Sequence, residues 1–518
     1  MFTRQTRCLM MILPCLMAFS LMAGEQSTGG IFYVNNKTGS DDFDGRDSEP
    51  GNNKAGPFLT IMQALKKCSV SARIEIANTG TDYRESVHIE NYRKGRPDAP
   101  LVINGNGANV SGLVVVAPEQ WMHLKDDIYY FVNKVGGADY KPRGWFDRKI
   151  GDSYYGPMLR NVWLRNGHQG WFTREEAPNA PQIFMLDGKP GENVLKLEDL
   201  PEGGFFYDSL AKTLKEPAGQ PALYFRLPKN RKLKDCLIEM PLNSGIYAGD
   251  DYTTIENIGS CYSSSDGFDG YWGQNVVFRN IHAFNNTEQG MSFHGNGSSF
   301  IDGGLIEHNG GCGIVDVMEC TSIYRNVTVR NNHPGGVLLR GFSHAMYNCR
   351  IMENSGDQIS TIPGTSVSLK NCLIVGCGPK ERGCGVDINY GLIDHCTIVN
   401  CTVGVKIVTG ASIRNSIMAD CPTILIADKN AMTRLTIGKT ILGLGEAVFD
   451  GQKIDSSGWA EFVKTFKGAE GAIIGMPNLE SPLFILPKDS PHFKAGDSGT
   501  TPGAQLPFFK EWMAKGSD

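Results

Sequence analysis

A glycine-led phrase recurs through the second half of the chain at intervals close to 23 residues. Gly290-Met-Ser-Phe and Gly313-Ile-Val-Asp are two copies, 23 residues apart, and in each the glycine is followed by an apolar residue and then by alternation. The phrase returns as far as Gly404. A period of about 20 to 50 residues is the signature of a solenoid, a propeller or an array. The chain must therefore stack many copies of one small unit.

Each period is built from short apolar-alternating runs separated by turns, as in "TSIYRNVTVRNN" and "ASIRNSIMADC". Three such runs per period, with no helical 3.6-residue pattern between them, predict one turn of a parallel β-helix. Successive turns stack at the strand spacing of about 4.8 Å, so residues one period apart lie one above another. The predicted fold class is all-β, a parallel β-helix with about 23 residues per coil.

Two residue types recur in this register. We expect corner asparagines to form a ladder, because Asn tolerates the left-handed turn conformation and its amide can bond its copy in the next coil. They are Asn257, Asn280, Asn326, Asn348, Asn371 and Asn415. We expect the cysteines to stack as buried thiols rather than as disulfides. One inward column would hold Cys349, Cys372 and Cys396, and another Cys377, Cys401 and Cys421.

The N-terminal residues have the layout of a secretory signal peptide. Arg4 and Arg7 precede an apolar run that Pro14 interrupts, and small residues follow at Ala23 and Gly24. This layout predicts a signal peptide over residues 1–24 and a secreted or periplasmic protein. No later segment is apolar enough to insert into a membrane. The net charge is −5, from 50 basic and 55 acidic residues mixed along the chain, which excludes a basic surface for nucleic acid.

The remaining chain divides into four segments. Residues 25–113 should form an N-terminal cap and the first coils, with a short amphipathic helix around Thr60 to Cys68 that covers the open end. Residues 114–241 lose the period and show alternating strands with turns, which predicts an inserted β-sandwich-like domain. Residues 242–444 should form the main β-helix, and residues 445–518 an irregular C-terminal tail that packs on the coils.

Several segments together resemble a known superfamily. "FYV…GSDD…DG…PFLTIMQAL", "PQIFMLDGKP…LPEGGFFYDSLAKTLK" and "SPLF…SPHFKAGD" are similar to secreted bacterial right-handed parallel β-helix proteins of the pectate-lyase-like superfamily. The insertion makes the chain most similar to the β-helix glycoside hydrolases that carry a small β-sandwich. The resemblance covers nearly the whole mature chain. It implies a right-handed solenoid that cleaves a polysaccharide or oligosaccharide, although this fold hosts hydrolases, lyases and epimerases.

Strand parity predicts which side chains face solvent. If the residue after each glycine points inward, the second and fourth residues after that glycine point outward. Asp269, Tyr271, Ser292, His294 and Arg340 then share one face, a shallow groove suited to an extended sugar chain. The candidate substrate-binding residues are Tyr247, Asp266, Tyr271, Trp272 and Arg340.

Glycoside hydrolysis needs two carboxyl groups, about 5 Å apart for retention or about 6.5 to 9.5 Å for inversion. Asp269 and Asp316 lie two coils apart, roughly 9.6 Å by the stacking rise, and a lean of the side chains could bring them into the inverting range. Parity places Asp316 inward, so either a bulge turns it outward or it is a buried carboxylate, functional or simply bonded to neighbouring backbone. Glu319 is the reserve acid. His294, on the coil between them, could orient a water or hold a sugar hydroxyl, or be an ordinary surface histidine.

A polysaccharide lyase is the competing enzyme class. Elimination on a uronic acid needs a base and a cation that stabilises the developing charge. Arg340, with His294 or Tyr271 as the base, and a calcium ion held by Asp266 and Asp269 would serve. The face is poor in lysine and arginine for an anionic polymer, which favours the hydrolase.

A third interpretation is a non-catalytic carbohydrate-binding β-helix. Tyr247, Tyr271 and Trp272 would then be binding platforms, and the acids would be unexplained. For the hydrolase we expect no cofactor, with Ca²⁺ as the alternative under the lyase. The expected partner is a polysaccharide or oligosaccharide, with no nucleic acid and no membrane insertion, and we expect a monomer.

Overall fold

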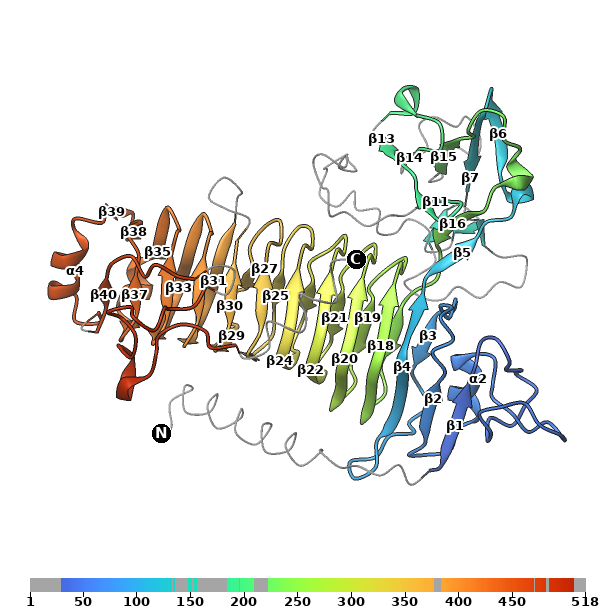
Figure 1. Cartoon of the computed structure of the whole chain (residues 1–518), viewed down its shortest axis with the longest axis horizontal. Helices are drawn as coiled ribbons and strands as arrows, with labels where there is room; N and C mark the ends of the chain where they lie inside the picture. The colour runs from blue at the N-terminus through green and yellow to red at the C-terminus, as the bar shows by residue number, and fades with distance from the viewer. Residues whose placement is uncertain are drawn as a thin grey trace.

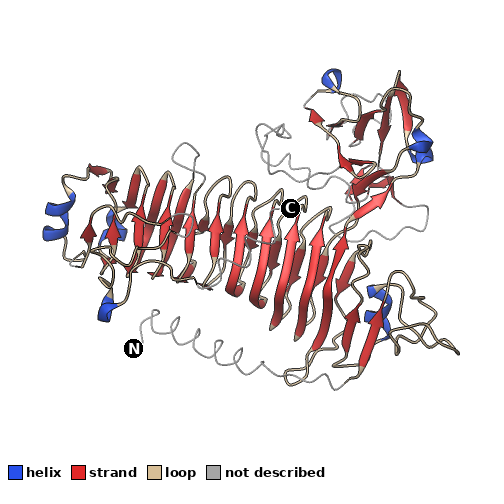
Figure 2. Cartoon of the chain, in the orientation of Figure 1, coloured by secondary structure: helices blue, strands red, loops and turns tan. Residues whose placement is uncertain are grey.

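The chain winds into one long parallel β-helix (Figure 1). The computed structural model describes residues 29–132, 134–135, 148–150, 153–155, 184–194, 196–208, 222–376, 383–469, 471–480 and 484–506. Within them, one sheet of 28 strands runs along the solenoid, and helices are few and short (Figure 2). The predicted β-helix is confirmed. The predicted signal peptide lies outside the described residues.

The strands stack in two columns, which we call column A and column B. Column A consists of β3 (Val87–Ile89), β17 (Ile246–Ala248), β19 (Phe268–Tyr271), β21 (Met291–His294), β23 (Ile314–Asp316), β25 (Val337–Leu339), β28 (Ile359–Thr361), the first halves of β31 (Cys384–Asp394) and β33 (Val403–Arg414), β35 (Thr423–Ala427) and β38 (Glu446–Phe449).

Column B begins with long strands that bend at a corner. These are β1 (Ile31–Val34), β2 (Arg73–Ile76), β4 (Leu101–Ser111), β18 (Thr253–Cys261), β20 (Val276–Phe284), β22 (Ser298–Glu307) and β24 (Thr321–Arg330). Beyond β24 the two arms separate at the corner. The arms are β26 (Ser343–Tyr347) with β27 (Arg350–Met352), β29 (Ser366–Lys370) with β30 (Leu373–Val375), the second half of β31 with β32 (Thr397–Val399), the second half of β33 with β34 (Ile417–Ala419), β36 (Leu435–Ile437) with β37 (Ile441–Leu442), and β40 (Ile473–Ile474).

The coil period appears directly in the strand register. Phe268 pairs with Met291, Met291 with Ile314, and Ile314 with Val337. These side chains point inward and are at most 1% exposed. Full burial of each contributes about 1.5–3 kcal/mol, and one continuous apolar cluster fills the solenoid from Phe32 to Ala469.

The predicted corner ladder is confirmed. All six corner asparagines have a left-handed backbone, with φ between 49° and 57°. The amide of Asn280 donates to Asn257 at 3.2 Å, and that of Asn371 donates to Asn348 at 2.7 Å. One corner position of the ladder holds Gly303 instead of asparagine, and it keeps the left-handed conformation with φ 77°. The corner therefore repeats because its backbone needs a residue that accepts positive φ.

A second asparagine ladder, which the sequence analysis did not predict, lies inside the turn that leads from column B to column A. Asn286, Asn309, Asn332 and Asn354 are at most 1% exposed. Each side-chain amide donates to the side-chain oxygen of the next at 2.9 Å, and Gln358 accepts the last bond. The same amides also donate to backbone carbonyls, so this ladder satisfies buried polar groups in consecutive coils.

The cysteine columns follow the predicted pattern. Cys349, Cys372 and Cys396 are fully buried, and Cys401 and Cys421 are nearly so. All of the cysteines that the structure describes are free thiols, as predicted. Cys377 lies outside the described residues.

Helices close both ends of the solenoid. The predicted cap helix is α2 (Ile61–Lys67), whose N-cap Thr60 accepts a hydrogen bond from the backbone of Gln63 at 3.2 Å. At the opposite end lies α4 (Trp459–Thr465), with the short α3 (Lys429–Met432) beside the last coils (Figure 1). Trp459 is fully buried against Phe449. Both caps cover apolar surface that an open coil would expose.

Between β4 and β17 the chain leaves the solenoid. β5 (Leu113–Val115) and β16 (Ile238–Pro241) pair as antiparallel strands where the chain leaves and returns. The other strands are β6 (Met122–Lys125), β7 (Ile128–Phe131), β8 (Lys134–Val135), β9 (Arg148–Ile150), β10 (Ser153–Tyr155), β11 (Met185–Leu186), β12 (Lys189–Pro190), β13 (Asn193–Val194), β14 (Phe205–Asp208) and β15 (Ala222–Arg226). A four-stranded and a five-stranded sheet share an apolar cluster around Trp121 and Phe225. Residues 156–183 and 209–221 lie outside the description, so the inserted sandwich stays a prediction.

The C-terminal tail lies against the last coils. Leu486 and Ala504 are buried in a cluster with Val399 and Ile417. The backbone amide of Ala504 donates to the hydroxyl of Thr397 at 2.9 Å. No helix in the described parts of the chain has the length and apolar character needed to span a membrane.

The buried ladder should matter more for stability than the corner ladder. We expect Asn309→Ala to lower the free energy of unfolding by about 2–4 kcal/mol, because it leaves buried amide and carbonyl partners unsatisfied. The matched control is Asn280→Gly, whose exposed corner suits glycine and should cost less than about 1 kcal/mol. Denaturant unfolding of both variants measures the difference, and equal losses would contradict this role for the buried ladder.

Candidate functional site

Column A presents aligned side chains on its outer surface, as strand parity predicts. Tyr247 pairs with Asp269, and Asp269 pairs with Ser292. Beside them, Tyr271 pairs with His294. The first of these outward series continues through Val315, Leu338, Ser360, Asp387 and Lys406. Because parallel strands hold these positions in register, the outer face is a rigid surface with one row of side chains per coil.

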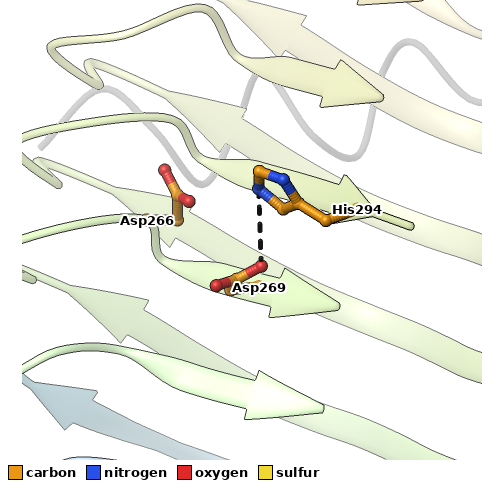
Figure 3. Close-up of side chains that lie close together, drawn as sticks. All are labelled: Asp266, Asp269 and His294. Carbon is orange, nitrogen blue, oxygen red and sulfur yellow. Dashed lines mark ion pairs between the residues drawn. The ribbon is translucent and has the colours of Figure 1, made fainter. Parts of the chain in front are cut away.

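Two carboxylates and an imidazole meet on this face (Figure 3). Asp269 lies on β19, His294 lies on β21 one coil further, and Asp266 lies in the turn before β19. One donor atom from each of the three residues lies within 4.8 Å of the others. His294 Nε2 is 3.8 Å from Asp269 Oδ1. The side chains of Asp269 and His294 are 20% and 29% exposed, so they can be reached from solvent.

Neighbouring groups hold these three side chains in place. The hydroxyl of Ser292 lies 2.8 Å from His294 Nε2. The carboxylate of Asp266 accepts a hydrogen bond from the backbone of Gln289 at 3.0 Å. The ring of Tyr271 lies 5.4 Å from that of His294. We call Asp266, Asp269 and His294 the acidic cluster. It is supported from two adjacent coils.

Tyr247 borders the cluster on its N-terminal side. Burial first, and then the negative charge of Asp269, hold the pKa of Tyr247 well above its usual value, so its hydroxyl remains a hydrogen-bond donor at neutral pH. One coil before it, His88 occupies the same outward series and its ring lies 5.8 Å from that of Tyr247. The sequence analysis missed His88. The alternation in "SVHIE" was its signal, but the insertion separates that strand from the next coil.

The other predicted binding residues lie around this centre. Trp272 follows β19 directly and is 52% exposed. Arg340 is exposed and lies two coils beyond His294 in the same outward series. Its backbone amide donates to the backbone carbonyl of Asp316 in the strand below. Glu319, the predicted reserve acid, is exposed in the turn after β23. The structure thus groups Tyr247, Asp266, Asp269, Tyr271 and His294, and leaves Glu319 and Arg340 on later coils.

Asp316 does not face this site. It is fully buried, and it pairs with the inward residues Phe293 and Leu339. Val315 occupies the outward position of this coil. The predicted pairing of Asp269 with Asp316 across one substrate is therefore wrong, since the two carboxylates lie on opposite faces of the same sheet.

Asp316 belongs to a polar cluster inside the solenoid. The hydroxyl of Tyr324 donates to both carboxylate oxygens at 2.9 and 3.0 Å, and His344 Nδ1 lies 3.0 Å from the carboxylate. Burial first, and then the charge of Asp316, hold the pKa of Tyr324 well above its usual value, so the phenol stays a donor. His344 Nε2 lies 2.7 Å from the backbone carbonyl of Arg340, which can only accept.

Asp266, Asp269 and His294 are the group of residues, within the described parts of the chain, whose donor atoms are close enough to hold a metal ion. Calcium favours about six to eight oxygen ligands, so a set of two carboxylates and one imidazole suits it poorly. A mixed nitrogen and oxygen set fits a first-row divalent ion better. The calcium alternative of the sequence analysis is therefore weakly matched by these residues.

The sequence matches the family described as right handed beta helix region over residues 227–345 and 315–421. From β17 onward, the described part of this match lies in the right-handed β-helix. This region contains column A from β17 to β33 and all residues of the acidic cluster. No curated protein shows a significant match to the chain.

Solved structures share the fold at low sequence identity. A complex of XylC with xylose has a TM-score of 0.50 at 11% identity, and the alignment covers 87% of each chain. A structure described as a glycoside hydrolase has a TM-score of 0.43 at 10% identity, covering 81% of this chain and 95% of that one. Pectate lyase Pel9A has a TM-score of 0.38 at 12% identity, covering 93% and 97%.

The burial of Asp316 separates a structural from a catalytic carboxylate. We expect Asp316→Asn to lower the free energy of unfolding by about 3 kcal/mol, because it replaces a buried carboxylate that accepts from Tyr324 and contacts His344. Asp269→Asn, on the outer face, should change it by less than about 1 kcal/mol. Urea unfolding followed by circular dichroism measures both. A stable Asp316→Asn variant would mean that the inner cluster contributes nothing to the core.

Proposed function

We propose that this protein is a carbohydrate-active enzyme that hydrolyses glycosidic bonds on the outer face of column A. The observation that carries the proposal is the convergence of Asp266, Asp269 and His294 on that face. Two carboxyl groups close together are the machinery of most glycoside hydrolases. The shared fold with a xylose-bound protein supports a sugar as the ligand.

Asp269 and Asp266 divide the two carboxylate roles between them. Asp269 projects from a strand and faces the substrate side, so it is the nucleophile. Asp266 is only 7% exposed and lies beside a second carboxylate, which favours the proton donor to the leaving oxygen. One oxygen of each carboxylate lies within 4.8 Å of the other, which is compatible with the separation of about 5 Å in retaining enzymes. The inferred reaction is therefore retention through a covalent intermediate.

His294 and Ser292 prepare this pair. His294 Nε2 stands between the hydroxyl of Ser292 at 2.8 Å and Asp269 at 3.8 Å. A histidine in that position can bond Asp269 or a sugar hydroxyl, and its ring is oriented by the serine. His294 therefore positions the nucleophile and the sugar. It takes no part in the proton transfer to the leaving oxygen.

The charges on this face favour a neutral sugar. The two outward series run from β17 to β25 in the described part of the chain. They contain one basic side chain of the arginine or lysine type, Arg340, and the carboxylate of Asp269 lies at their centre. A uronic-acid polymer would meet repulsion near the acidic cluster and little compensation elsewhere. We infer a substrate with uncharged hydroxyl-bearing rings, such as a xylan or a glucan.

A lyase is the second candidate, and one observation favours it. Asp266, Asp269 and His294 could hold a divalent ion, which would stabilise the charge that develops during elimination on a uronic acid. The base would then be Tyr271, with Arg340 as a further positive charge two coils away. Chelation separates the candidates, because only the lyase depends on the ion.

Hydrolysis should produce new reducing ends without an unsaturated product. We expect purified protein to release reducing ends from a neutral polysaccharide in the presence of EDTA, and Asp269→Asn and Asp266→Asn each to lower kcat about a thousandfold. His294→Ala should lower kcat less, by about tenfold to a hundredfold. Reducing-end assays over a panel of neutral and uronic-acid polysaccharides, with ultraviolet absorbance read in parallel, measure these changes.

The matched control is Asp387→Asn. Asp387 lies in the same outward series but is paired with Lys406 at 2.8 Å, far from the acidic cluster, so its loss should leave kcat unchanged. Appearance of the ultraviolet chromophore, abolished by EDTA, would replace the hydrolase by the lyase. Binding without either product would leave a carbohydrate-binding protein.

The carboxylate separation also predicts the stereochemistry. Because one oxygen of Asp266 lies within 4.8 Å of Asp269, the pair fits the retaining geometry, and the first product should keep the anomeric configuration of the substrate. Proton NMR during the first minutes of hydrolysis identifies that anomer. An inverted product would assign the second acid to another residue of the face.

A further inference from the structure

Trp272 adopts a backbone conformation that normally belongs to glycine. Its φ is 66°, in the left-handed region, where a bulky side chain is strained. Continuing the strand register by one residue aligns it with Gly295, then Met318 and then Gly341 on successive coils, with φ of 75°, 61° and 115°. Two of these four turns use glycine as the backbone demands. The other two carry large apolar side chains instead.

The strained positions do not serve the core. Trp272 is 52% exposed and Met318 is 55% exposed. Phe342, which follows Gly341 in the turn after β25, is 62% exposed. An exposed side chain gains little from burial, so these residues are not explained by folding stability. We call Trp272, Met318 and Phe342 the apolar strip.

The strip is continuous with the acidic cluster. The ring of Tyr271 lies 5.4 Å from that of Trp272 and 5.4 Å from that of His294. The Trp272 ring rests on the next coil, because a side chain at Gly295 would lie 2.7 Å from it. One face of the indole is thereby supported. The strip then runs from the cluster along the solenoid axis, toward the C-terminal coils.

We propose that the apolar strip binds successive units of one neutral glycan chain that extends from the acidic cluster along the axis toward the C-terminal coils. This inference rests on the proposed function of that cluster. Sugar rings present an apolar C–H face with hydroxyl groups at the rim, and flat aromatic or thioether side chains suit the apolar face. Exposed polar residues, Asn296 and Glu319, alternate with the strip and can meet the hydroxyls.

A protein partner fits this strip poorly. A stable protein interface buries roughly 800 Å² on each side, with a closely packed apolar centre. The strip instead consists of single apolar side chains on separate coils, interrupted by glycine and by polar residues. A thin extended ligand can touch all three side chains, because coils rise by only about 4.8 Å.

The experiment measures binding against chain length. Isothermal titration of the wild-type protein uses linear β-1,4 xylan and glucan oligosaccharides, from disaccharide to hexasaccharide. Trp272→Ala should weaken every length about tenfold, the loss expected for one stacked ring. Phe342→Ala should weaken only the longer members, since only they reach that coil. The matched control is Leu444→Ala, 53% exposed near the far end of the solenoid, which should change no length.

The strained backbone provides a variant that keeps the fold. Trp272→Gly relieves the left-handed strain, so it should leave the midpoint of thermal unfolding unchanged or raise it while still weakening binding about tenfold. Trp272→Phe keeps a ring and should recover most of the affinity.

The outcomes distinguish the strip from the hydrolase. Length-dependent binding that the variants abolish supports the strip, even when no oligosaccharide is cleaved. Cleavage with no effect of Trp272→Gly or Phe342→Ala on binding would overturn the strip and leave the hydrolase. Equal losses for all lengths on Phe342→Ala, or no binding by the wild-type protein, would also overturn it.

Discussion

The parallel hydrogen-bonded stacking of one coil on the next is the constraint on which this structure depends. Each coil buries its inward side chains only if its neighbours stay in register, as Phe268, Met291 and Ile314 do. The backbone alone would allow the coils to slip at their turns. The asparagine ladders prevent this, because Asn309 donates to Asn332 one coil later and to the carbonyl of Ala283 at the end of β20 one coil earlier. Register at the turns therefore fixes register in the strands, and with it the alignment of every outward side chain.

Much of this architecture could be predicted from sequence because it is periodic. Residues one period apart share an environment, so the inward apolar positions, the corner asparagines and the buried thiols could each be recognised from their copies. The inner ladder is equally periodic, in "FNN", "HN", "RNN" and "EN". The corner asparagines were predictable because Asn accepts the left-handed turn conformation. Periodicity shows that a position repeats, and it does not show which of two polar columns is buried.

The site was harder to predict because its geometry depends on exceptions to the period. Parity correctly placed Asp316 inward, but its partners, His344 and Tyr324, lie on column B and only the three-dimensional coil brings them together. Parity alone therefore left both an outward bulge and a buried carboxylate open. Asp266 presented the opposite difficulty. It precedes its strand, so strand parity says nothing about its direction, and only the turn geometry brings it beside Asp269.

The repeating backbone of a β-helix leaves few positions free to carry function. Inward positions are fixed by the core and corner positions by their left-handed turns, so the outer face of column A and the turns after it remain for chemistry. Glycine meets the demand of such a turn at no steric cost, as at Gly295 and Gly341. When the same turn instead carries Trp272 or Met318, half-exposed and strained, the backbone cost needs a gain elsewhere, which the proposed glycan contact supplies. In a repeating structure the neighbouring coils supply the reference for this comparison, so a departure from glycine in one column can indicate a ligand surface.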